Sequence, residues 1–266
     1  MIKLISKEVD QISVVIMHMK NSFLVILMVL IVLTALTIDY NSPINKSLFN
    51  GSNDPLNPLT NFNGMNQAVT LGTDNDGYVV RGGPYGNVKS TVKVAYIIGV
   101  HPREVKAHTA ILWAVLTQKN MSYSYYIYWV HVTKDEYNYN QGRINGQNLA
   151  AEYVVPNVVK GNFKMAVDIH SNRGVNAGYK ECRFVVSPIQ GVSSETAARN
   201  IISKIPWLTY YLPKGDKGPK SPKFVTLPLI NSGVTSVIYE TYMYESYNLT
   251  LEHAEEFLGA VDGLNI

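Results

Sequence analysis

The sequence predicts an α/β sandwich of three layers (α/β/α), in which helices cover both faces of a mixed, mainly parallel sheet. Two observations lead to this fold class. From about Ala68 onward, short runs rich in Val, Ile and Tyr alternate with segments of helical pattern, as is typical of α/β domains. The 266-residue chain is also 46% hydrophobic and only 16% charged, so it can bury a sizeable core.

The expected elements follow one another along one globular domain, residues 67–266. Strands are predicted where β-branched and aromatic residues dominate, at residues 92–100, 123–132, 164–169, 183–187 and 234–239. Helices are predicted at residues 105–118, 147–159, 193–204 and 251–261, and Pro156 interrupts the second of these.

A run of sixteen uncharged, mostly apolar residues, 23–38, precedes this domain. As a helix it spans roughly 24 Å, slightly less than the hydrocarbon core of about 30 Å. Lys3, Lys7 and Lys20 come before it, so the positive-inside rule places residues 1–22 in the cytoplasm and the rest of the chain outside. We expect a transmembrane signal anchor, or a cleaved signal peptide that would make the protein secreted. Residues 39–66, rich in turn formers, then form a linker.

Charge and cysteine content exclude two classes of function. The net charge of +3 is too small to indicate nucleic-acid binding, and no nucleic-acid-binding motif is present. The single cysteine, Cys182, rules out an internal disulfide framework and a cysteine-based zinc site.

Polar residues follow several predicted strands, at the edge where α/β sheets build their sites. His101 and Glu104 come after the first strand, His170 closes the third, and Glu240 closes the last. Arg143 lies in a predicted loop. Two histidines and a glutamate suit a zinc ion with an open fourth position, a second glutamate can take a proton from water, and an arginine can stabilise an oxyanion.

These are the parts of an amide hydrolase, although each residue has a plainer alternative. A buried or capping histidine is common, Glu104 also suits the first turn of a helix, and loop arginines are frequent. Glu245, five residues after Glu240, is a rival for the role of base.

The motif His101-Pro102-Arg103-Glu104, followed by Arg143, by Asp168-Ile169-His170 and by Glu240, resembles the zinc carboxypeptidase superfamily. The resemblance is closest to its succinylglutamate desuccinylase and aspartoacylase branch. It implies that one zinc ion is bound by His101, Glu104 and His170. It also implies that Glu240 is the general base and that Arg143 polarises the scissile carbonyl. Asp168 shares a strand face with His170 and is expected to support it.

In this family an Asn-Arg pair binds the substrate carboxylate, and the chain departs from the family at this pair. Asn148 matches the Asn, but Leu149 stands in place of the Arg. Arg173, three residues after His170, is the expected substitute. Tyr242 or Tyr244 is the expected tyrosine near the leaving group.

The sequence therefore predicts a zinc-dependent hydrolase of amide bonds, anchored in the membrane and acting outside it on cell-wall or extracellular peptides. Two alternatives stay open. One is an N-acyl amino acid deacylase of the desuccinylase or aspartoacylase type, and the other is a surface-binding protein that keeps the fold without catalysis.

Overall fold

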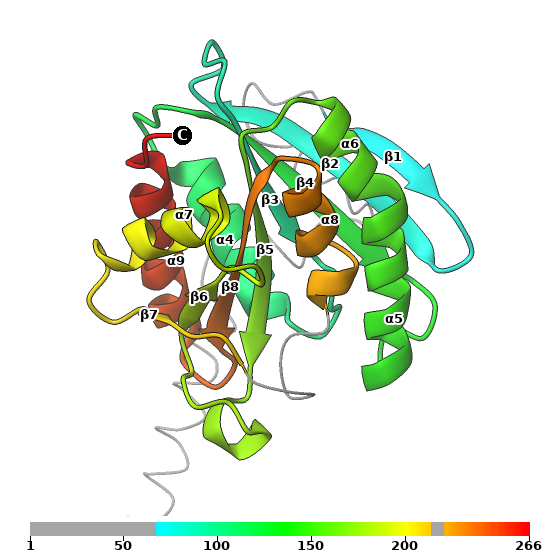
Figure 1. The fold of residues 1–266 in the computed structure, drawn as a ribbon. Coiled ribbons are helices and arrows are strands. Elements are labelled where there is room, and N and C mark those ends of the chain that lie inside the picture. The colour runs from blue at the N-terminus through cyan, green and yellow to red at the C-terminus, as the bar shows by residue number, and fades with distance from the viewer. Residues whose placement is uncertain (1–67, 214–220) are drawn as a thin grey trace, which may run out of the picture. The chain divides into compact units, whose positions relative to one another are not determined.

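The computed structural model describes residues 68–213 and 221–266 (Figure 1), which all belong to one compact unit, Pro58–Ile266. The predicted cytoplasmic segment (1–22), membrane segment (23–38) and linker (39–66) lie outside the described residues. Among the residues that are described, no helix combines the length and the apolar character needed to cross a membrane.

Within the described residues, a mixed sheet of eight strands forms the middle layer, in the order β1-β2-β4-β3-β5-β8-β6-β7. The central strands β4, β3, β5 and β8 run parallel, whereas β1, β2 and β6 join the sheet in antiparallel pairs. The strands are β1 Val69–Thr73, β2 Gly77–Gly86, β3 Lys93–Ile98, β4 Ser124–Val132, β5 Met165–Asn172, β6 Phe184–Val186, β7 Thr209–Tyr210 and β8 Thr235–Tyr242. Every residue of β5 is buried, as expected for a strand covered on both faces.

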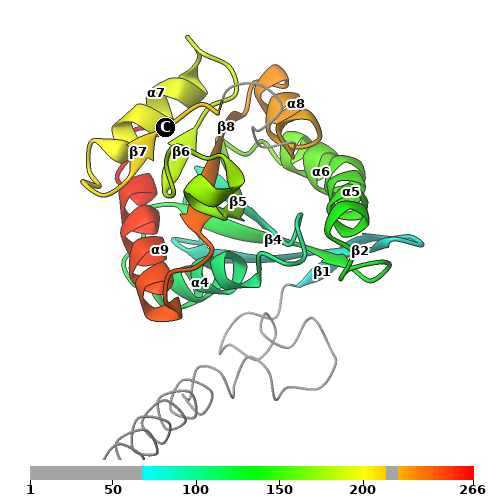
Figure 2. The same ribbon diagram turned by 90° about the horizontal axis from the view of Figure 1, so that it is seen from below.

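Helices cover both faces of this sheet, which confirms the three-layer prediction (Figure 2). On one face lie α4 (Val105–Thr117) and α9 (Tyr247–Asp262), with α7 (Ser193–Ile202) beside α9. On the other face lie α5 (Tyr139–Leu149), α6 (Val155–Lys160) and α8 (Thr226–Asn231). A π-helical turn, Ala150–Val154, joins α5 to α6.

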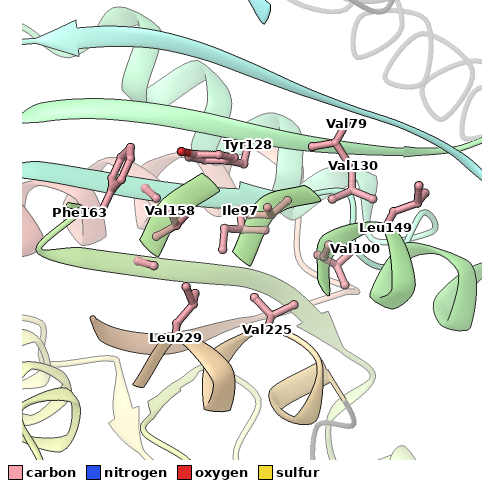
Figure 3. Packing of buried hydrophobic residues seen from close by; sticks show 14 of the residues in the cluster. Val79, Ile97, Val100, Tyr128, Val130, Leu149, Val158, Phe163, Val225 and Leu229 are labelled. Carbon is pink, nitrogen blue, oxygen red and sulfur yellow. The ribbon is translucent and has the colours of Figure 1, made fainter. Parts of the chain in front are cut away.

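A buried apolar cluster fixes α5 and α8 against the sheet (Figure 3). Ile97 of β3 and Val130 of β4 contribute from the sheet, Leu149 from α5, and Leu229 from α8. All four are at most 2% exposed, so removing them from water supplies a large part of the force that holds α5 in place. The position of α5 matters because this helix carries several residues of the site.

Several features of the fold differ from the sequence prediction. Strands β1, β2 and β7 and helix α8 were not predicted. The many glycines of β2 resemble turn formers, and β7 has only two residues. Helix α5 begins at Tyr139 rather than at residue 147, since the Asn138 side chain accepts from the backbone N–H groups of Asn140 and Gln141 and caps it. Strands β5 and β8 continue to Asn172 and Tyr242, and so His170 and Glu240 lie inside strands rather than at their ends.

Candidate metal centre

The three predicted metal ligands converge. Nδ1 of His101 lies 3.1 Å from Oε1 of Glu104, and Nδ1 of His170 lies 2.9 Å from Oε2 of the same carboxylate. The two imidazole rings are 4.3 Å apart between centroids. One ligand atom from each residue lies within 4.8 Å of the others, and all three side chains are buried.

A glycine turn after β3 delivers two of these ligands. Gly99 has a φ of +84°, and a Cβ there would lie 2.0 Å from the carbonyl oxygen of Val130, so only glycine allows the chain to turn toward His101. Glu104 then occupies the N-cap position of α4 without capping it. Its carboxylate instead lies within hydrogen-bond distance of Nδ1 of both histidines and accepts from the backbone N–H of Ser171, at 3.0 Å.

Strand pairing brings Glu240 to the same place. β5 and β8 are parallel neighbours in which His170 is directly opposite Glu240, so the two side chains project from the same face of the sheet. Glu240 is only 3% exposed, and one of its oxygens accepts from the Asn172 amide at 3.2 Å.

The buried groups of the site differ in charge. Burial raises the pKa of Glu240 to about 8 and lowers the pKa of His101 to about 4. Burial also acts against the charged forms of Glu104 and His170, but attraction to neighbouring groups outweighs it. His101 and His170 hold the pKa of Glu104 well below its usual range, and Asp168 and Glu104 hold the pKa of His170 well above its own. Two carboxyl groups with pKa values pushed apart are typical of sites with an acid–base function.

Arg143 also reaches the centre, but from a helix rather than from the predicted loop. It lies on α5, and its Nη1 donates to Oε1 of Glu104 at 2.8 Å. Its guanidinium sits 5.2 Å from the ring centroid of Tyr139, and the guanidinium of Arg173 sits at the same distance from that ring. One tyrosine therefore contacts two cationic side chains.

Several of these groups face a cavity of about 100 Å³, whose wall does not include His170. His101, Glu104, Arg143, Arg173 and Glu240 contribute to its wall. The remaining lining residues are Pro102, Arg103, Asn138, Tyr139, Ser171, Asn172, Ala177, Tyr179 and Met243.

The donor set suits a metal ion, because two imidazole nitrogens and one carboxylate are the ligands that zinc takes at sites with an open position. Metal-ligating histidines are also supported through their other nitrogen. Oδ1 of Asp168 lies 3.0 Å from Nε2 of His170, which confirms that they share a face. Nε2 of His101 lies 3.1 Å from the side-chain amide of Gln147.

Four residues considered in the sequence lie away from the cavity wall. Asn148 is exposed, because each helical residue turns the side chain by about 100° relative to its neighbour, and Gln147 is the one that faces the site. Tyr244 is 60% exposed, whereas Tyr242 is half-buried and packs against it edge to face. Glu245 binds Nε of Arg183 at 2.6 Å, so Glu240 is the carboxylate that faces the cavity.

Sequence reasoning missed several residues of the site, among them Tyr139, Gln147 and Tyr179. A signal for the first two was present. Tyr139, Arg143 and Gln147 are spaced four apart, which places them on one face of a helix, and Asn138 is a favoured N-cap residue. Tyr179 lies in irregular chain after the Gly174–Ala177 turn, where no periodic pattern identifies it.

Comparison with known proteins finds similarity in fold. No family model and no curated protein matches the chain. The metallo-carboxypeptidase of Burkholderia cenocepacia superposes with a TM-score of 0.51 at 12% identity, covering 83% of this chain and 69% of that one. The metallo-carboxypeptidase of Pseudomonas aeruginosa superposes with a TM-score of 0.50 at 11% identity, covering 75% of this chain and 64% of that one. A candidate metallopeptidase of Shewanella denitrificans superposes with a TM-score of 0.50 at 13% identity, covering 77% of this chain and 86% of that one.

This chain thus shares its fold with the metallo-carboxypeptidases, and this is the fold that the resemblance of its motifs implies.

Proposed function

We propose that this chain is a zinc-dependent hydrolase of amide bonds, of the carboxypeptidase type. The observation that carries the proposal is the convergence of the ligand atoms of His101, Glu104 and His170 beside a cavity that His101, Glu104 and Glu240 line. The carboxypeptidase-like fold supports it.

Each residue has a chemical role in this proposal. Zinc, when bound by His101, Glu104 and His170, supplies a Lewis acid that lowers the pKa of water and polarises a carbonyl group. Glu240 takes a proton from the attacking water and passes it to the leaving amine. Arg143 lies in the cavity wall as a fixed cation, where it stabilises the negative charge that develops on the carbonyl oxygen.

The arginines also indicate the substrate class. Arg173 lines the cavity and stacks on Tyr139, and a guanidinium group binds a carboxylate through two parallel hydrogen bonds. In this proposal Arg173 binds the substrate carboxylate, which the buried apolar side chain of Leu149 cannot do. We propose a peptide with a free carboxylate as the substrate. An N-acyl amino acid carries the same group and is the competing substrate class.

The location is part of the proposal. Residues 23–38 would hold the chain in the membrane, with residues 1–22 in the cytoplasm and the catalytic domain outside, near cell-wall or extracellular peptides. When protease is added to intact cells, we expect it to cleave the domain of residues 67–266. Protection of the domain until the cells are opened would refute this arrangement.

Zinc content and hydrolysis test the chemistry. We expect one zinc ion per chain, loss of zinc in His101→Ala, and retained zinc with hydrolysis lowered by about 10²–10⁴ in Glu240→Gln. Glu245→Gln is the matched control, which should keep both properties. Cleavage of peptides but not of N-acyl amino acids supports the carboxypeptidase type, and the reverse supports a deacylase. A folded protein that binds no zinc, or that hydrolyses neither substrate, would refute the proposal.

A further inference from the structure

Different chemical groups support the two histidines of the candidate metal centre from behind. Nε2 of His170 faces the carboxylate of Asp168 at 3.0 Å, whereas Nε2 of His101 faces the amide of Gln147 at 3.1 Å. Asp168 and Gln147 are 0% and 4% exposed. An ionised carboxylate only accepts hydrogen bonds, but an amide can either accept through its oxygen or donate through its nitrogen.

The backbone fixes Gln147 in this position. A Cβ on the preceding residue, Gly146, would lie 2.1 Å from the carbonyl oxygen of Val100, so glycine is what lets α5 approach the segment that carries His101. Two residues after Gln147, Leu149 is anchored in the apolar cluster. The amide is therefore held next to His101 from both sides.

The contacts of His101 correspond to one of its two neutral tautomers. With its proton on Nδ1, the ring donates to Glu104 and accepts from the Gln147 amide nitrogen, as both distances allow. If Nδ1 binds a metal ion, the proton must sit on Nε2, and its partner must be an acceptor. A half-turn of the Gln147 amide exchanges nitrogen for oxygen in nearly the same position.

We infer that Gln147 is a positioning residue that hydrogen-bonds His101 in both tautomers and so keeps the metal centre ordered with and without its ion. This inference rests on the proposed zinc site. A carboxylate at position 147 would support only the tautomer that binds the metal. The amide therefore makes the centre release zinc more readily than a centre with carboxylates behind both histidines.

Zinc affinity, measured by competition with a chelator, tests this role independently of hydrolysis. Gln147→Met keeps the length of the side chain without its hydrogen bonds and should weaken binding by about tenfold to a hundredfold. Gln147→Glu should tighten binding by about tenfold. Asn140→Ala, at an exposed position of the same helix, should leave affinity unchanged. An unchanged affinity in Gln147→Met, or a weaker one in Gln147→Glu, would overturn the inference.

The wild-type chain provides a second test that needs no variant. With ¹⁵N-labelled histidine, NMR should place the His101 proton on Nδ1 in the metal-free protein and on Nε2 after zinc is added. A proton on Nε2 in both states would overturn the inference. Zinc binding that ignores position 147 refutes only the role of Gln147, whereas a folded wild-type protein that binds no zinc refutes the proposed function itself.

Discussion

Two buried carboxylates in this molecule have similar partners and different surroundings. Glu104, in the cavity, pairs with Arg143 at 2.8 Å and with His101 at 3.1 Å and His170 at 2.9 Å. Glu245, after β8, pairs with Arg183 at 2.6 Å and with His253 at 3.5 Å.

The difference lies in what surrounds each carboxylate. Glu245 also accepts from the Thr250 hydroxyl at 3.2 Å, and its histidine partner, His253, stacks on Trp207 with 3.7 Å between ring centroids. That arrangement ties the chain after β8 to α9 and is absent from the cavity wall. Glu104 instead holds two histidines whose Nδ1 atoms share its carboxylate beside an open cavity. Residue types alone do not distinguish a structural ion pair from a metal centre; the second histidine and the cavity do.

The largest expected effect is at Glu104. Glu104→Gln removes the charge of a metal ligand, so zinc affinity should fall by more than about a hundredfold, the upper end for residues that only support a ligand. Hydrolysis should fall to the background rate. Metal analysis of the purified variant provides the measurement. Full zinc content in this variant would show that Glu104, like Glu245, is a structural carboxylate and not a metal ligand.

The same substitution at the other carboxylate, Glu245→Gln, should instead lower the free energy of unfolding. Breaking a fully buried ion pair costs about 3–5 kcal/mol. Since the Arg183 side chain keeps 30% exposure, we expect a loss of about 2 kcal/mol in the free energy of unfolding. Urea unfolding of the zinc-loaded protein gives this value, and zinc content provides the internal control. Loss of zinc in this variant would place Glu245 in the site and contradict the comparison.

A comparable effect on stability, confined to the metal-free protein, depends on pH. Burial raises the pKa of Glu240 to about 8, whereas an unperturbed glutamate titrates near about 4.3. Between these values the folded metal-free protein holds a proton that the unfolded chain has released, so stability falls as pH rises. Relative to Glu240→Gln, the metal-free wild type should lose up to about 3 kcal/mol between pH 5 and 8. Urea unfolding with a chelator measures this difference, and parallel pH profiles would contradict it.

The smallest expected effect is at Arg173, which is exposed at the cavity rim. Arg173→Ala should raise KM about tenfold for substrates with a free carboxylate, since one hydrogen bond to a charged group is worth about 1.5 kcal/mol in such a setting. The same peptide with an amidated C-terminus is the control and should show little change between wild type and variant. Equal losses for both peptides would mean that Arg173 does not read the carboxylate.

Much of the site was accessible from the sequence. His101, Glu104, His170 and Glu240 follow or close runs with a strong strand pattern, and the carboxyl ends of parallel strands meet at one edge of a sheet. Asn148 and Arg143 show the limit of this reasoning. The polar α5 lacks a hydrophobic stripe over its first turns, so its start was not predicted, although Asn138 is a favoured N-cap residue.

The sequence by itself determined the alternation of strands and helices and the identity of the three candidate ligands, because burial patterns and strand-end positions are local properties. Tertiary structure alone decided which of two glutamates faces the cavity, and that Tyr139 contacts both Arg143 and Arg173. It also decided that Gln147 lies behind His101. The last of these outcomes depends on how closely α5 approaches the turn after β3, an approach that Gly146 allows and the packing of Leu149 stabilises, and such a tertiary contact is not specified by any local pattern.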